Sequence, residues 1–298
     1  SAHSSQLLWQ TYVPASKPIT SGDYNLMTLT RPDQSSSTVA VLKMDDFAFH
    51  QYAYGDYATT IEFERGTFNA FDPEGTAEAD SGSVYELQFA PSAGVPGTFV
   101  FDPGVVFKVP RVEVVNNDYS TLVMNGSEFH VGGTFWHRGK AVATNGAEIS
   151  VGYLGGTGKG EYTQNNGSFY LGGDETKLWT RGGFTLKRGA FTNDGASVVI
   201  GGNLRIDEDA IGAKFVQEGG SLTVTGQYDP NDVKAEFRIR GGTATFASSY
   251  GLYTHGGRIV VESEEGRGAT FTVALPNVRS TNNRLHDVRF DYAGGFNP

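Results

Sequence analysis

The sequence predicts an all-β protein in which a parallel β-helix, or β-solenoid, follows an N-terminal antiparallel β cap. Three observations indicate this fold. The 298 residues include 40 Gly, 20 Phe, 14 Tyr and 3 Trp, a composition typical of β proteins with many turns rather than of helical bundles. A glycine-containing motif recurs from about residue 120 onwards. Between these turns, apolar and polar residues alternate as they do in strands.

Proline, glycine and charge all change in frequency near Pro110. Residues 1–110 hold eight of the 11 prolines, whereas residues 111–298 hold 32 of the 40 glycines. Acidic residues outnumber basic ones by 13 to 5 before this point and by only 20 to 18 after it. We therefore predict four regions: an extended arm over 1–22, a β cap or sandwich-like region over 23–110, the solenoid over 111–276 and a C-terminal extension over 277–298.

The predicted cap contains two alternating runs and one acidic loop. The runs are "STVAVLKM" at 37–44 and "ATTIEFERGTFNAF" at 58–71, and both have the period of two expected of strands. The loop around residues 72–80 carries Asp72, Glu74, Glu78 and Asp80. Because the EF-hand pattern is missing, we predict a solvated acidic loop, and calcium binding by these hard oxygen ligands is the alternative.

The predicted solenoid is marked by a glycine turn that recurs about every 22 residues. A coil of three strands of about five residues, each followed by a short corner, uses roughly 21–24 residues. Residues after each turn alternate, which predicts that pairs such as Phe129 and Val131 or Leu222 and Val224 face a shared core. The turn glycines are Gly126, Gly146, Gly167, Gly195, Gly220, Gly242 and Gly257.

Glycine suits these corners because it adopts positive φ without steric cost, and Asn or Asp before it tolerates the same region. The same Asn-Gly pairs also form two-residue hairpins, so an antiparallel meander is the alternative. Many of the runs do not come in tightly linked pairs, and a period of 22 is long for hairpins. These two features favour the parallel solenoid.

Residues 120–275 resemble the repeats of secreted right-handed β-helix proteins, such as autotransporter passenger domains and polysaccharide lyases. The resemblance is carried by the pattern Asn-Gly, small residue, alternating hydrophobic residues and Gly-Gly, as in "NGAEISVG" at 145–152. It concerns architecture and not one family. It implies an extracellular protein whose parallel crossovers have the usual right hand.

Two motifs resemble nucleotide-binding sequences, but neither has the residues that a nucleotide-binding site requires. "GTGK" at 156–159 is not a Walker loop, because Gly160 stands where Ser or Thr is needed and Tyr153 where glycine is needed. "HGGRIVVESEEGRGATFTVALP" at 255–276 resembles the closing β-hairpin of sensor histidine kinase ATP-binding domains. The nucleotide-binding motifs of that family are missing here. This stretch therefore predicts two strands joined by an acidic glycine turn.

Charge and residue types exclude several classes of partner. A formal net charge of −10 repels phosphate backbones, so we expect no nucleic-acid partner. The chain has no cysteine, and its six histidines show no metal-binding spacing. We expect no cofactor, no metal and no membrane span. A start at Ser1 fits a secreted chain whose leader has been removed, although any trimmed N-terminus would look the same.

Candidate binding residues fall into two groups. The first is aromatic rings near the corners of successive coils, where they stack on sugar faces or simply pack over coil ends. The second is cations on one strand face that could neutralise a uronate, or that are ordinary surface charges. The candidates for sugar contact are Trp136, Tyr153, Tyr170 and Trp179 among the aromatic residues, and Arg238 and Arg240 among the cations.

Carboxylates give no clear catalytic pair in the sequence. A glycosidase needs two that face each other across the substrate. Asp174 and Glu175 are adjacent, as are residues 207–209, so side-chain alternation separates them. Carboxylates from neighbouring coils, about 4.8 Å apart, remain an alternative source of a pair. Exposed loop acids are the simpler interpretation.

The evidence is therefore architectural. We expect an extracellular structural or adhesive solenoid, without enzymatic activity, that assembles with its own copies into a fibre, sheath or surface layer, because terminal coils expose sheet edges. The N-terminal arm is a candidate donor strand. The alternative is a polysaccharide-binding or polysaccharide-degrading β-helix protein.

Overall fold

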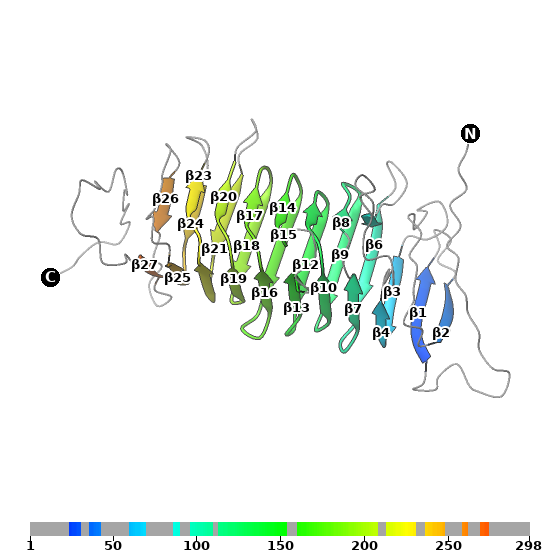
Figure 1. Cartoon of the computed structure of the whole chain (residues 1–298). Helices are drawn as coiled ribbons and strands as arrows, with labels where there is room; N and C mark the ends of the chain where they lie inside the picture. The colour runs from blue at the N-terminus through cyan, green and yellow to red at the C-terminus, as the bar shows by residue number, and fades with distance from the viewer. Residues whose placement is uncertain are drawn as a thin grey trace, which may run out of the picture.

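The computed structural model describes residues 24–30, 36–42, 60–69, 86–89, 96–109, 113–153, 160–207, 213–230, 236–247, 258–261 and 269–273. These residues form strands that stack coil upon coil into a parallel β-solenoid (Figure 1), and no helix occurs among them. The predicted all-β solenoid is confirmed.

Three sheets run along the solenoid. Sheet 1 has the order β2 (Ser36–Leu42), β1 (Tyr24–Thr30), β3 (Thr60–Arg65), β6 (Gly97–Phe101), β9 (Ser120–Asn125), β12 (Lys140–Thr144), β15 (Ser168–Gly172), β18 (Ala190–Asp194), β21 (Lys214–Gln217), β24 (Glu236–Ile239) and β26 (Arg258–Val261). Sheet 2 has the order β4 (Thr67–Asn69), β7 (Val106–Val109), β10 (Glu128–Val131), β13 (Glu148–Val151), β16 (Lys177–Thr180), β19 (Ser197–Ile200), β22 (Ser221–Val224), β25 (Gly242–Phe246) and β27 (Ala269–Val273). Sheet 3 has the order β5 (Glu86–Phe89), β8 (Glu113–Asn116), β11 (Phe135–His137), β14 (Tyr162–Gln164), β17 (Phe184–Leu186), β20 (Leu204–Ile206) and β23 (Tyr228–Pro230).

From β3 to β23, each coil visits sheets 1, 2 and 3 in turn, as β9, β10 and β11 do. Strands of successive coils pair in parallel, so that Ala141 lies between Leu122 of the preceding coil and Phe169 of the next. This parallel pairing excludes the alternative of an antiparallel meander for the coils. The coil that contains β12 to β14 is longer than the one after it, because residues 154–159 lie between its second and third strands.

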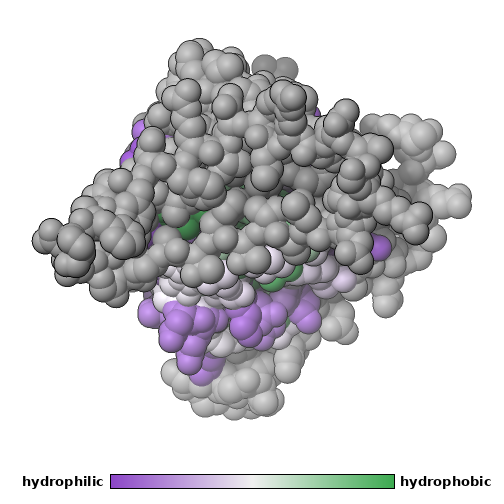
Figure 2. Space-filling view, turned by 90° about the vertical axis from the view of Figure 1, so that its left-hand side faces the viewer, coloured by the Kyte–Doolittle hydropathy of each residue, from purple (hydrophilic) through white to green (hydrophobic). Residues whose placement is uncertain are grey.

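The core is a continuous column of stacked apolar side chains. Along sheet 1, Phe169, Phe191, Phe215 and Phe237 lie opposite one another in register, with successive ring centroids 5.5, 4.8 and 5.1 Å apart. Each buried ring stabilises the fold by about 2–3 kcal/mol through loss of apolar surface from water. Every core residue predicted from the alternation is fully buried. Seen from the C-terminal end, the described surface shows a hydrophilic patch, with paler and hydrophobic residues visible above it between grey residues (Figure 2).

The glycine corners are also confirmed, with one correction. All the predicted turn glycines from Gly126 to Gly242 have positive φ, whereas Gly257 lies outside the described residues. Gly167, however, lies between β14 and β15, at the corner from sheet 3 to sheet 1, while the others lie at the corner from sheet 1 to sheet 2. In the same coil, the glycine with positive φ at the corner from sheet 1 to sheet 2 is Gly173. The list of turn glycines predicted from the sequence therefore includes both kinds of corner, because both use the same turn chemistry.

The N-terminal cap is an antiparallel hairpin. β1 pairs antiparallel with β2, and on its other side antiparallel with β3. β3 in turn pairs parallel with β6, so parallel coils already begin at residue 60 and not at the expected boundary near 111. Long connections at 70–85 and 90–95 hide the period there. The arm (1–22), the loop at 72–80 and the extension (277–298) lie outside the described residues.

The two strands expected within 255–276 are present as β26 and β27, and they are not paired as in the kinase-type hairpin that this stretch resembles. β26 belongs to sheet 1 and pairs parallel with β24, whereas β27 belongs to sheet 2 and pairs parallel with β25. These strands are consecutive elements of one coil. A glycine turn between two alternating runs predicts a hairpin and a solenoid corner equally well, and only the neighbouring coil decides between them.

Candidate functional site

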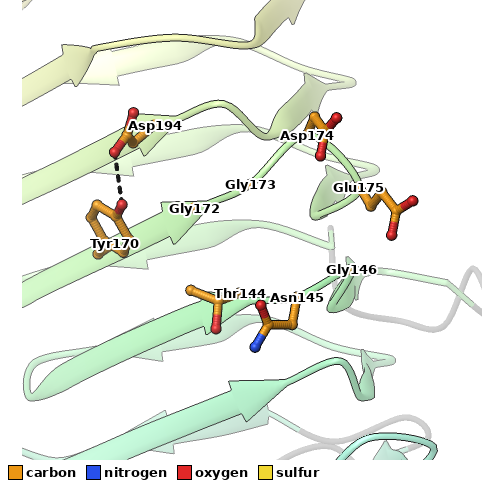
Figure 3. A pocket seen from close by; sticks show the side chains of 9 residues that line it. All are labelled: Thr144, Asn145, Gly146, Tyr170, Gly172, Gly173, Asp174, Glu175 and Asp194. Carbon is orange, nitrogen blue, oxygen red and sulfur yellow. Dashed lines mark hydrogen bonds between the residues drawn. The ribbon is translucent and has the colours of Figure 1, made fainter.

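A hollow of about 370 Å³ lies at the corner between sheets 1 and 2, across three successive coils. Its lining comes from the ends of β12, β15 and β18 and from the corners that follow β12 and β15 (Figure 3). The lining is polar and glycine-rich. It consists of Thr144, Asn145, Gly146, Tyr170, Gly172, Gly173, Asp174, Glu175 and Asp194.

Tyr170 is the aromatic member of this lining. Its side chain points outward from β15 and is 37% exposed. The hydroxyl donates a hydrogen bond of 2.7 Å to Oδ2 of Asp194 on the next coil, as Figure 3 shows. This hydrogen bond, followed by partial burial and the charge of Asp194, raises the pKa of Tyr170. The phenol therefore stays protonated.

A tight Asn-Gly corner forms part of the lining of the hollow. Asn145 and Gly146 have φ of 56° and 79°, values that glycine and asparagine tolerate better than other residues. The Asn145 amide donates a 2.6 Å hydrogen bond to Oδ1 of Asn125 in the preceding coil. Thr176 Oγ1 accepts from the Gly146 N–H at 3.3 Å and donates to the Gly172 carbonyl at 2.7 Å. These bonds fix the corners of neighbouring coils relative to one another.

The hollow carries negative charge. Asp174, Glu175 and Asp194 contribute three carboxylates, all on exposed residues, and none of the nine lining residues is Lys or Arg. Asp174 and Glu175 come from one coil and Asp194 from the next. Acids from two neighbouring coils therefore line the same hollow.

The other predicted aromatic residues lie on different sheets. Tyr170 is in sheet 1, Trp179 is in β16 of sheet 2, Tyr153 follows β13 of sheet 2, and Trp136 is in β11 of sheet 3. Trp179 is 38% exposed, while Tyr153 and Trp136 are half-buried. The four rings therefore do not form one stack along a single face.

Tyr153 belongs to a small polar cluster on sheet 2. Its ring lies 5.4 Å from the ring of His130. His130 Nδ1 is 2.7 Å from Oγ of Ser150, and its Nε2 is 3.0 Å from Oε2 of Glu128. These contacts tie adjacent coils together across the outer surface.

The two predicted cations are engaged in ion pairs. Arg238 lies 2.8 Å from the Glu236 carboxylate, and Arg240 lies 2.8 Å from that of Glu218. A uronate would have to compete with these carboxylates. Asp207 is similarly paired, with Arg205 Nε at 2.7 Å.

A carboxyl pair that sequence reasoning missed lies on sheet 1. Partial burial is the first cause of a raised pKa in both Glu62 and Asp102, and a hydrogen bond joins their side chains. Glu62 is in β3 and Asp102 follows β6 in the next coil. The sequence does not indicate that these two residues lie side by side, because the stretch of chain between them is much longer than the period of about 22 residues.

Sequence reasoning also missed a column of polar side chains inside the solenoid. Asn116, His137 and Gln164 are fully buried at equivalent positions of three coils in sheet 3. Asn193 and Gln217 form a second column in sheet 1, joined by a 3.0 Å hydrogen bond. Their amides also bond backbone carbonyls at the corners. Buried polar groups of this kind hold the turns in place.

In the described part of the chain, no group of three or more His, Asp or Glu side chains could hold a metal ion. No described helix is long and apolar enough to cross a membrane.

The chain was compared with protein-family models, with curated proteins and with solved structures, and none of the three comparisons found a match.

Proposed function

We propose that this chain is an extracellular structural or adhesive β-solenoid that associates end to end with its own copies. The observation that carries the proposal is the state of the sheet edges. Among the described strands, the β1–β2 hairpin extends only sheet 1, and β4 and β5 are the outermost strands at that end of sheets 2 and 3. The outer strand of a sheet is a template for another strand.

The direction of the strands supports head-to-tail stacking. β4 and β27 are the two outer strands of sheet 2, and every pairing between them is parallel. A second copy placed beyond β27 would offer its own β4 in the same direction. Such a contact joins two different surfaces, and repetition of it produces an open filament rather than a closed dimer.

Electron microscopy and sedimentation velocity of the full chain over a range of concentrations test this proposal. We expect filaments whose length grows with concentration, and fibre diffraction with a spacing of about 4.8 Å along the axis. A particle that stays monomeric at every concentration would contradict it. A variant without residues 1–22 then tests the arm: shorter or fewer filaments would assign the donor strand to it, and unchanged filaments would assign the contact to the coil edges.

A further inference from the structure

We propose that the hollow between sheets 1 and 2 binds one pyranose unit of a glycan, stacked on Tyr170, and that it selects sugars without a carboxylate. This binding site goes beyond the proposed scaffold function and does not depend on assembly.

The Tyr170 ring is held in place before any ligand arrives. A Cβ on Gly172 would lie 2.6 Å from Cε1 of the ring and 2.9 Å from its hydroxyl oxygen, so the ring lies directly over this glycine. The hydrogen bond to Asp194 fixes the other end of the side chain. An aromatic ring that is already ordered loses little conformational entropy on binding.

The lining suits a sugar ring. The exposed face of Tyr170 can pack against the apolar C–H face of a pyranose, whose polarised hydrogens meet the negative face of the aromatic ring. Carboxylates accept hydrogen bonds from sugar hydroxyls, and amide and hydroxyl groups such as those of Asn145 and Thr144 donate as well as accept. A concave site of several hundred Å³ with a few convergent polar groups is the usual form of a small-ligand site.

Charge determines which sugars fit. Asp174, Glu175 and Asp194 surround the hollow without a lining cation. A uronate would bring a fourth carboxylate to this surface and be repelled. Neutral sugars and amino sugars meet no such repulsion. Because Arg238 and Arg240 are already paired, neither the hollow nor these cations favour the uronate polymers that the lyase resemblance implies.

Isothermal titration calorimetry of the full chain with three hexasaccharides tests the proposal: a neutral glucose oligomer, a glucosamine oligomer and a galacturonate oligomer. We expect the first two to bind and the galacturonate to bind at least about tenfold more weakly. Absence of binding by all three, or preference for galacturonate, would overturn the proposal.

Variants separate a binding platform from a ring that only covers Gly172. Tyr170→Thr should weaken binding about tenfold or more, while Tyr170→Phe keeps the ring and should stay within about threefold of the parent. Tyr119→Thr is the matched control, because Tyr119 is 51% exposed between β8 and β9 and does not line the hollow. Equal loss in Tyr119→Thr, or none in Tyr170→Thr, would contradict the assignment.

A double variant tests the discrimination against galacturonate while leaving Tyr170 unchanged. The double variant Asp174→Asn, Glu175→Gln changes two exposed side chains, so we expect it to fold normally. It should reduce the discrimination against galacturonate by about threefold or more, because two repelling charges are removed. An unchanged ratio of neutral to galacturonate affinity would show that charge does not select the ligand.

Discussion

At the scale of single residues, the most informative side chain is His137, which is buried in the interior of the solenoid. Its Nε2–H donates to the Ser168 carbonyl at 3.0 Å, so Nδ1 must accept from the Asn116 amide, also at 3.0 Å. Both ring nitrogens are satisfied only when the imidazole is neutral. Burial lowers the pKa of His137 to about 4 from an ordinary value of 6.5.

This shift predicts a pH-dependent loss of stability. Between pH 6.5 and 4 the unfolded chain binds a proton at this position and the folded chain does not, so stability is full above pH 6.5 and falls as the pH drops towards 4. The loss amounts to about 3 kcal/mol. Denaturant unfolding at pH 7, 6, 5 and 4 measures it.

The variant His137→Gln isolates this contribution. Gln164 occupies the equivalent position in the next coil, so glutamine is suited to this environment. The parent should lose unfolding free energy between pH 6.5 and 4, whereas His137→Gln has no titrating group at this position and should not show this loss. We therefore expect the stability of the parent relative to the variant to fall as the pH falls. Parallel stability curves across the whole range would show that His137 does not titrate on unfolding.

At the scale of the element, the corners are constrained by the neighbouring coil as well as by their own backbone. Gly167 has φ of 72°, and a Cβ there would collide with the carbonyl oxygens of Gly139 and Arg138 in the preceding coil. Gly104 has a similar φ of 81°, but a Cβ there would meet nothing within 4 Å. A side chain at Gly104 would meet only the cost of positive φ, whereas one at Gly167 would also collide with the neighbouring coil.

Alanine substitution should distinguish the two cases. Gly104→Ala should destabilise the protein by about 1 kcal/mol, the cost of a left-handed conformation in a residue with a Cβ. Gly167→Ala should cost about 3 kcal/mol or more, because two coils must also move apart. Thermal or denaturant unfolding of both variants measures the difference, and equal costs would mean that the coils can separate freely at this corner.

At the scale of the whole molecule, charge and sheet edges act in opposite directions on assembly. The net charge of −10 makes copies of the chain repel one another, and salt screens this repulsion over about 8–10 Å. Backbone pairing at an edge is short-ranged and depends far less on salt. The proposed filament should therefore be limited by repulsion at low ionic strength.

We accordingly expect self-association to increase with salt. Sedimentation velocity at about 0.02 M and about 0.5 M sodium chloride, at one protein concentration, should show larger assemblies at the higher salt. The opposite trend would mean that ion pairs between copies, and not strand edges, hold the assembly together.

The class of fold, the glycine corners and the alternating core can be predicted from sequence, because they depend on short-range chemistry: positive φ at a turn and a period of two in a strand. Phe129, Val131, Leu222 and Val224 were all predicted to be buried and are. The same local logic could not tell the two corner types apart at Gly167.

The residues that meet across coils are visible only in the stacked fold. Tyr170 and Asp194, Asn116 and His137, and Glu62 and Asp102 each lie in different coils. Their separation along the chain varies with the length of the connections between strands. A coil brings residues together through the register of its parallel strands, and that register is set by the stacking of the whole core, which no short stretch of sequence specifies.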